Sequence, residues 1–187
     1  MKRSDVRKLA AGVVAAALLA YLGFWPVPVQ PVAWPAPEDL GHWGPHSTNQ
    51  GLAGLRHIDL GGENGPEHVA FGPDGRLYVA VAGGKVLRMA ADGSGREVFA
   101  DTGGRVLGFD FDVTGQLIAA DAYRGLLSIS PEGRATVLAD AFEGEPLRYA
   151  DAVVVAEDGR IYFSDASTRF APAEWGGTFE ASELDIH

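Results

Sequence analysis

Short runs of alternating apolar and polar residues fill most of the chain, and three of these runs share one pattern. The strings at residues 69–79, 109–119 and 153–163 each contain an apolar strand, a turn that closes on glycine and a second apolar strand. In Asp-Gly and Thr-Gly turns, glycine supplies the positive φ that a β-hairpin needs. The turn glycines are separated by 40 and 44 residues: Gly75, Gly115 and Gly159. The pattern predicts three hairpins of one repeating unit.

The first two hairpins are each followed by two further strands. The third strands are expected at residues 85–89 and 126–129, and the fourth at 97–100 and 136–139. Four strands in about 40 residues are typical of one blade of a β-propeller. The sequence therefore predicts an all-β domain with two complete blades and the inner half of a third, about two and a half blades of a partial β-propeller.

This incomplete β-propeller is expected to occupy residues 52–187. Residues 55–60 are expected to supply an outer strand to the blade that closes the ring. Propellers usually need about four to eight blades, and an open ring leaves apolar sheet faces and strand edges uncovered. Two interpretations follow: the chain is part of a longer protein, or several chains associate to complete a ring.

The N-terminal segment has a different pattern, because residues 9–25 are apolar apart from Tyr21 and follow a basic stretch at residues 1–8. This length predicts a helix that can just cross a membrane. The basic residues predict that residues 1–8 stay in the cytoplasm and that the propeller is exported, to the periplasm or the extracellular space. A cleaved signal peptide, which would give a secreted protein, is the alternative. Residues 26–51 are Pro-rich and are expected to form an extended linker.

Composition excludes several classes of function. The net charge is -10, and four of the 15 basic residues lie within the first eight positions, so the remaining chain is more acidic still. Such a chain repels phosphate backbones, which makes it a poor nucleic-acid binder, and it favours cationic partners. The absence of cysteine excludes disulfides, thiolate metal sites and a cysteine nucleophile.

Two carboxylates stand at equivalent positions of the repeat. Counting eight residues back from each turn glycine gives Glu67, Leu107 and Asp151, each just before an inner strand. Inner strands line the central channel of a propeller, so we expect these positions to converge. Converging carboxylates repel one another unless a cation or protons lie between them, and Ca²⁺ accepts oxygen ligands in flexible geometry. Glu67 and Asp151 are therefore candidate Ca²⁺ ligands; the alternative is that they only cap turns.

Other polar residues are weaker candidates. Asp121 and Asp165 lie six residues after a turn glycine and are expected to accept backbone hydrogen bonds in the next turn. His68 is either a base in the channel or a side chain that points into the sheet. Residues 167–169 either contact an anionic substrate or form an ordinary loop. No catalytic residue is identified.

Four strings resemble one family: Gly65-Pro66-Glu67, Leu107-Gly108-Phe109, the segment 120–126 and the segment 161–170. They resemble the strictosidine synthase-like branch of six-bladed β-propellers, which includes the adipocyte plasma membrane-associated protein. That branch is similar to gluconolactonase, regucalcin and paraoxonase. The resemblance covers roughly residues 52–182 and implies a partial six-bladed propeller behind an N-terminal anchor.

The resemblance also implies a chemistry. Lactonase relatives hold a divalent cation, usually calcium, on a Glu and several Asn or Asp residues, which assigns the first ligand to Glu67. Asp151 stands where the family often has Asn, and the remaining ligands are expected beyond His187. The implied function is a calcium-dependent lactonase or esterase-type hydrolase acting on a small lactone or ester. The alternatives are a strictosidine synthase-like carbon–carbon bond-forming enzyme and a non-catalytic, membrane-anchored binding module.

Overall fold

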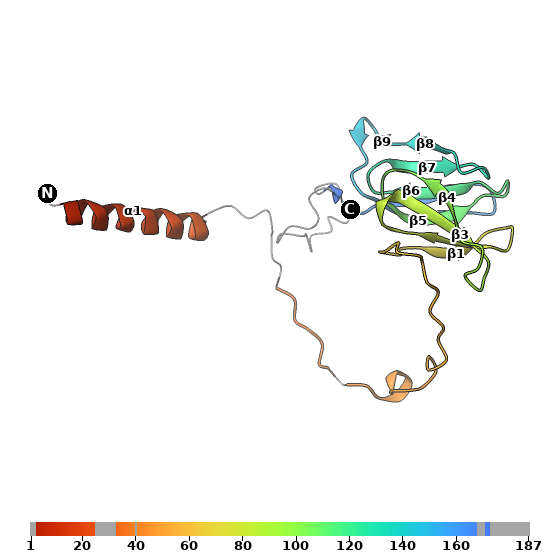
Figure 1. Ribbon diagram of the computed structural model, residues 1–187, viewed down its shortest axis with the longest axis horizontal. Helices are drawn as coiled ribbons and strands as arrows, with labels where there is room; N and C mark the ends of the chain where they lie inside the picture. Colours follow the sequence, from red (N-terminus) through yellow and green to blue (C-terminus); the bar gives the residue numbers. More distant parts are fainter. Residues whose placement is uncertain (1–2, 25–32, 40, 168–170, 173–187) are drawn as a thin grey trace. The chain divides into compact units, whose positions relative to one another are not determined.

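The computed structural model describes residues 3–24, 33–39, 41–167 and 171–172. The chain divides into two compact units, with the boundary between Trp34 and Pro35. The first unit contains a single helix within its described residues, and the second contains the strands (Figure 1).

Helix α1 spans Arg3–Phe24 and is rich in alanine and leucine, which favour helix. Its segment Asp5–Phe24 has 20 residues and a mean hydropathy of 1.6. At about 1.5 Å per residue it measures about 30 Å, close to the thickness of the hydrocarbon core of a bilayer. By length and composition the helix suits either a membrane anchor or a signal sequence.

Two four-stranded antiparallel sheets follow, each with its strands adjacent in chain order. The first sheet contains β1 (Val69–Phe71), β2 (Leu77–Ala80), β3 (Lys85–Met89) and β4 (Glu97–Asp101). The second contains β5 (Val106–Phe111), β6 (Leu117–Asp121), β7 (Gly125–Ile129) and β8 (Ala135–Ala139). Two hairpins complete the described strands: β9 (Ala141–Phe142) with β10 (Glu145–Pro146), and β11 (Ala150–Val155) with β12 (Ile161–Asp165). The predicted two blades and a half are confirmed, and the small β9–β10 hairpin is an addition.

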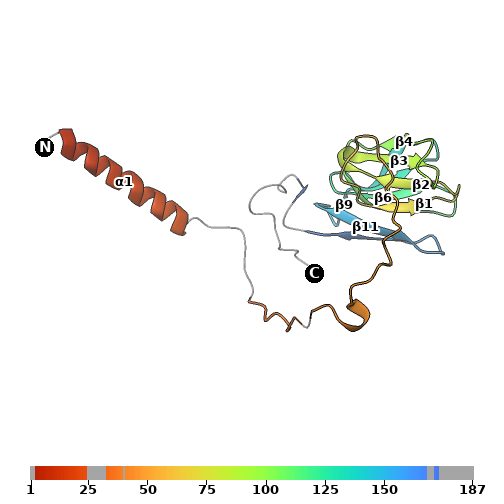
Figure 2. The same cartoon turned by 60° about the horizontal axis from the view of Figure 1, so that its bottom comes forward.

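The two complete blades pack face to face, and the main core lies between them (Figures 1 and 2). Tyr78 and Val86 from the first sheet meet Phe109 and Leu127 from the second, and all four are buried. The Tyr78 and Phe111 rings meet edge to face, with centroids 4.9 Å apart. Layered packing of this kind is how successive blades of a propeller bury their apolar faces.

The half-blade β11–β12 lies against β5 and β6 of the second blade (Figure 2). Gly108 allows the close approach, because a Cβ at this position would lie 2.6 Å from the carbonyl oxygen of Asp151. Further along the same strand, Asp110 Oδ2 accepts a hydrogen bond of 2.8 Å from the backbone N–H of Val155. These contacts fix the start of β11 beside the start of β5.

Residues 55–60 form no strand in the described structure, and the closing blade for which they are expected to supply an outer strand is not among the described residues. The segment is extended but pairs with no strand, and Ile58 and Leu60 pack against the apolar face of the first blade. That face presents Val79 and Leu87, which stay buried under this cover. The alternating apolar residues thus shield a sheet face instead of extending a ladder.

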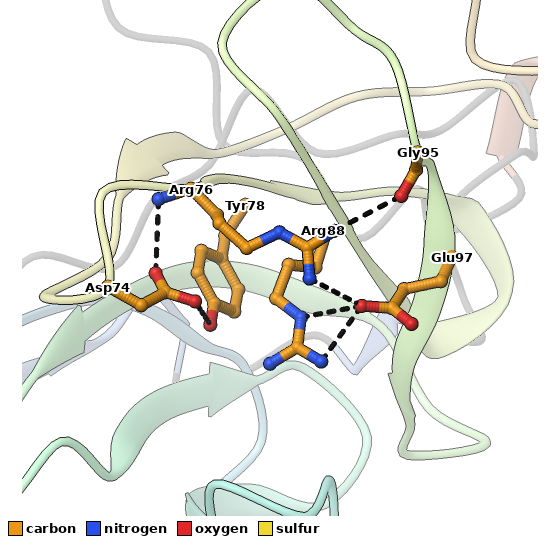
Figure 3. Close-up of polar contacts among 6 residues, drawn as sticks. All are labelled: Asp74, Arg76, Tyr78, Arg88, Gly95 and Glu97. Atoms are coloured by element: carbon orange, nitrogen blue, oxygen red, sulfur yellow. Dashed lines mark hydrogen bonds and ion pairs between the residues drawn. The ribbon is translucent and has the colours of Figure 1, made fainter.

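A polar cluster holds the strands of the first blade together at the end where β2 begins (Figure 3). Glu97 Oε1 accepts hydrogen bonds from Arg76 Nη1 at 2.8 Å and from Arg88 Nε at 2.9 Å, which links β4 to β3 and to the β1–β2 turn. The guanidinium of Arg88 lowers the pKa of Glu97. Burial raises the pKa of Tyr78, whose hydroxyl donates to Asp74 at 3.1 Å.

Two short 3₁₀ helices, Gly44–His46 and Ala82–Gly84, lie between these elements. His42 and His46, in and beside the first of these helices, are exposed.

Candidate functional site

A hollow of about 530 Å³ lies where the inner strands of the blades begin. Eight residues line it: Glu67, Arg105, Leu107, Tyr123, Tyr149, Asp151, Ala166 and Pro172. The lining includes all three positions found eight residues before a turn glycine, so the predicted convergence of Glu67, Leu107 and Asp151 is present in the structure.

Glu67 reaches the hollow from the segment just before β1. Its backbone N–H donates to the carbonyl of Ala80 at 3.0 Å, which ties the segment to the end of β2. Its side chain is 40% exposed and forms an ion pair with Arg105, through Oε1 and Nη2. Arg105 lies in the β4–β5 connection, so the ion pair joins the first blade to the second.

The guanidinium of Arg105 rests against Gly65. A Cβ on Gly65 would lie 3.3 Å from Arg105 Nη1 and 3.4 Å from the Cβ of Ala82, and Gly65 also has a φ of 56°. Glycine adopts this backbone conformation without strain. The Gly65-Pro66-Glu67 string therefore contacts the guanidinium in two ways: Gly65 leaves room for it to pack against the backbone, and Glu67 is its carboxylate partner.

Asp121 organises the two loops that carry Arg105 and Tyr123. The carboxylate is fully buried and accepts hydrogen bonds from Thr102 Oγ1 at 2.6 Å and from the backbone N–H groups of Arg105, Tyr123 and Arg124 at 3.0, 3.0 and 3.1 Å. Buried carboxylates need several donors of this kind. The expectation that Asp121 accepts backbone hydrogen bonds is confirmed, and through them it positions two residues of the hollow.

Asp165 positions the loop before the third hairpin by accepting hydrogen bonds from its backbone. It accepts hydrogen bonds from the backbone N–H groups of Arg148 at 3.1 Å and Tyr149 at 2.5 Å. The N–H of Ala166 returns a bond of 2.7 Å to the carbonyl of Tyr149. Tyr149 is thereby held at the wall of the hollow. The first blade has Val81 at the equivalent position, six residues after its turn glycine.

The electrostatics of the hollow reflect its two carboxylates. Burial raises the pKa of Asp151, and the negative charge of Glu67 raises it further. Burial also raises the pKa of Tyr149, and the charge of Asp151 adds to this effect. The charge of Glu67 thus lies close enough to Asp151 to oppose its ionisation.

Comparison with known sequences finds relatives for part of this chain. A family model described as "Strictosidine synthase-like, N-terminal" matches residues 44–89, which include Gly65, Glu67 and the first hairpin. The protein strictosidine synthase-like 4 of Arabidopsis thaliana is 39% identical over 125 residues, and strictosidine synthase-like 6 of the same plant is 38% identical. Over this part, the chain is similar to the strictosidine synthase-like superfamily.

The match of the chain to these relatives is partial. It covers 64% of the chain and 34% of each of the two Arabidopsis proteins, so the chain spans about a third of their length. Among solved structures, a gluconolactonase of Xanthomonas campestris is similar, with a TM-score of 0.53 and 21% identity over 66% of this chain and 41% of the other. That similarity supports the partial propeller fold.

The donor atoms in the lining of the hollow are of the kind that a hard cation prefers. Glu67 and Asp151 present carboxylate oxygens, the preferred ligands of Ca²⁺, and a cation would offset the charge of Glu67 that opposes the ionisation of Asp151. Within the described ranges, no group of three or more His, Asp or Glu side chains is arranged to hold a metal ion. Because Ca²⁺ takes about six to eight oxygens, these two carboxylates form only part of a site.

Of the remaining candidates, His68 and Ser167 are among the described residues, and neither lines the hollow. His68 is turned into the blade interface, where its ring meets that of Phe109 edge to face at 4.6 Å between centroids, as expected for a side chain that points into the sheet. Ser167 is buried, whereas Thr168 and Arg169 lie outside the described residues. Sequence reasoning missed Arg105; the available signal was a basic residue two positions before Leu107 in an otherwise acidic chain.

Proposed function

We propose that this chain is the N-terminal part of a calcium-dependent hydrolase of lactones or carboxylic esters. The observation that carries the proposal is the convergence of Glu67 and Asp151, from two different blades, on one hollow. The raised pKa of Asp151 supports it, because a cation between the two carboxylates would stabilise both in their ionised form. The resemblance to the strictosidine synthase-like and gluconolactonase propellers agrees with this chemistry.

Different residues of the hollow would bind the cation and contact the substrate. Glu67 and Asp151 would hold the cation, which supplies Lewis-acid polarisation of the ester carbonyl when bound. Leu107 offers an apolar wall for the carbon skeleton of the substrate, and the rings of Tyr123 and Tyr149 form two further walls. Asp121 and Asp165 keep the loops of these tyrosines in place.

The N-terminal helix suits a propeller on the exported side of a membrane. Arg7 and Lys8 lie before the most apolar part of α1, and basic residues of this kind stay on the cytoplasmic side. We propose that α1 anchors the chain and that the hollow faces the periplasm or the extracellular space, where calcium is available.

Terbium luminescence of the full-length natural protein tests the metal site directly. Tb³⁺ replaces Ca²⁺ on oxygen ligands, and the tyrosines that line the hollow would sensitise its emission. We expect Glu67→Gln and Asp151→Asn each to abolish the signal that added Ca²⁺ competes away in the wild-type chain. Glu132→Gln and Asp158→Asn are the matched controls, because both carboxylates lie in turns away from the hollow. Equal signals in all five proteins would reject the site.

Activity is tested on the full-length natural protein. We expect lactone or aryl ester hydrolysis to stop when the metal is chelated and to return with Ca²⁺. Loss of a Lewis acid removes several kcal/mol of transition-state stabilisation, so Glu67→Gln should lower kcat/KM about a hundredfold or more. Hydrolysis that survives both chelation and Glu67→Gln would contradict the proposal. Turnover of an amine with an aldehyde would instead favour carbon–carbon bond formation.

A further inference from the structure

Arg105 is the one positively charged side chain among the described residues that line the hollow. Its guanidinium pairs with Glu67, the first of the two carboxylates assigned to the cation. The side chains are only 25% and 40% exposed, so solvent screens the pair incompletely. A cation bound to Glu67 would meet this guanidinium at short range, and like charges at short range repel.

The position of Arg105 is determined by two blades. In the second blade, Asp121 accepts a hydrogen bond of 3.0 Å from the backbone N–H of Arg105. In the first blade, Gly65 packs against the guanidinium and Glu67 forms an ion pair with it. The backbone is therefore anchored independently of the ion pair with Glu67. A change in the partner of the guanidinium needs only rotation of the side chain, with the loop left in place.

The charge balance of the hollow changes sign when a divalent cation enters. Glu67, Asp151 and Arg105 give the lining a net charge of -1 when all three are ionised. A cation of charge +2 converts this to +1. The metal-free hollow repels anions, and the metal-loaded hollow attracts them.

We propose that Arg105 and the divalent cation are alternative partners of Glu67, and that the cation, by displacing the guanidinium, turns Arg105 into an anchor for a carboxylate of the ligand. The planar guanidinium donates two parallel hydrogen bonds to a carboxylate, which gives it orientation as well as affinity. The ligand class is therefore a hydroxy-carboxylate, or a lactone or ester that carries or releases one. This inference rests on the proposed calcium site.

Calorimetric titration of the detergent-solubilised full-length natural protein with Ca²⁺ tests the competition. Arg105→Gln removes the charge but keeps a polar side chain, and we expect it to bind Ca²⁺ about tenfold more tightly than the wild type, a coupling of ordinary size. Arg105→Lys keeps the charge and should leave Ca²⁺ affinity near the wild-type value. Arg160→Gln removes the same charge from the exposed β11–β12 turn and is the matched control.

Binding of glycolate, the simplest hydroxy-carboxylate, tests whether the released Arg105 anchors a ligand carboxylate. We expect Ca²⁺ to tighten glycolate binding to the wild-type chain about tenfold, and glycolate to tighten Ca²⁺ binding by the same factor, because coupling is reciprocal. Arg105→Gln and Arg105→Lys should both lose this coupling, since neither has the guanidinium fork. Arg160→Gln should retain it.

The outcomes separate this inference from the calcium site itself. If Glu67→Gln leaves the Ca²⁺ isotherm unchanged, the proposed site is absent and the inference falls with it. If Ca²⁺ binds through Glu67 but Arg105→Gln binds it equally or more weakly, the inference alone is wrong, and the Arg105–Glu67 pair is a structural link between blades. A circular dichroism spectrum and a thermal melt of each variant verify that folded proteins are compared.

Discussion

Asp151 is surrounded by features that oppose its ionisation. Burial is the larger effect, and the charge of Glu67 adds to it, so the pKa of Asp151 is raised above its ordinary value of 3.8. The folded state then binds a proton more tightly than the unfolded chain does. The contribution of this group to stability is fully present below 3.8 and is lost as the pH rises through the raised pKa.

Replacement of this carboxyl by an amide should therefore alter the pH dependence of stability. In metal-free buffer, we expect the free energy of unfolding of Asp151→Asn relative to wild type to increase as the pH rises above 3.8 and to level off above the raised pKa. Urea unfolding at a series of pH values measures it. Asp158→Asn, in an exposed turn, controls for the loss of a carboxylate. A difference that stays constant with pH would mean that the hollow does not disfavour the ionised Asp151.

The convergence of Glu67, Leu107 and Asp151 could be predicted from the repeat, because equivalent positions of successive blades point to one axis. Arg105 could not be predicted in this way. It lies ten residues before Gly115, and the third hairpin has Tyr149 at the equivalent position. Its partners belong to the preceding blade, and a contact between blades leaves no periodic signal in the sequence.

At the scale of elements, the strands followed from local pattern wherever a hairpin turn fixed their pairing. Residues 55–60 show the same alternation of apolar and polar side chains, yet they form no strand. Alternation reports that one face is buried and does not report whether the backbone pairs with a neighbouring strand. Here Ile58 and Leu60 bury that face against the first blade without pairing.

The contact between β5 and β11 depends on the absence of a side chain at Gly108. A Cβ there would meet only backbone atoms, at 2.6 Å from the oxygen of Asp151 and 3.0 Å from the Cα of Ala152, so β11 must move away. We expect Gly108→Ala to destabilise the fold by about 2 kcal/mol, as overpacking does. Because β11 carries Asp151, terbium luminescence from the hollow should also weaken.

Urea unfolding measures the loss of stability in Gly108→Ala, and terbium titration measures the loss of luminescence from the hollow. Gly54→Ala is the matched control, because a Cβ on Gly54 has no neighbour within 4 Å. If Gly108→Ala matched this control in both stability and terbium binding, the close approach of β11 to β5 would not be what brings Asp151 to the hollow.

For the molecule as a whole, the apolar surfaces left on the sheets indicate where further structure fits. Val69 and Phe71 are exposed on β1, and Val154, Tyr162 and Phe163 are exposed on the half-blade. In a closed propeller, neighbouring blades cover such faces. Association of several chains through these faces stays a prediction, as does their burial by additional blades of a longer protein.

Whether the strands of the second unit, Pro35–His187, are held at a membrane depends on helix α1. We expect the full chain to stay with membranes after alkaline carbonate extraction and to keep its N-terminus, with an intact mass of 19.7 kDa. Arginine costs about 2.5 to 3.5 kcal/mol at the centre of a spanning helix. The double variant Leu18→Arg and Leu19→Arg, near the middle of the apolar segment, should therefore be extracted.

The control places the same pair of substitutions at Leu52 and Leu55. Both are exposed residues of the second unit, Pro35–His187, which contains the strands and is called the β-unit here. This variant should remain with the membrane, because its helix is unchanged. A wild-type chain that is recovered in soluble form and has lost the mass of α1 would contradict the anchor and identify the helix as a signal sequence. The hollow would then act in solution on the exported side, with the same carboxylates and the same guanidinium, because all of them belong to the β-unit.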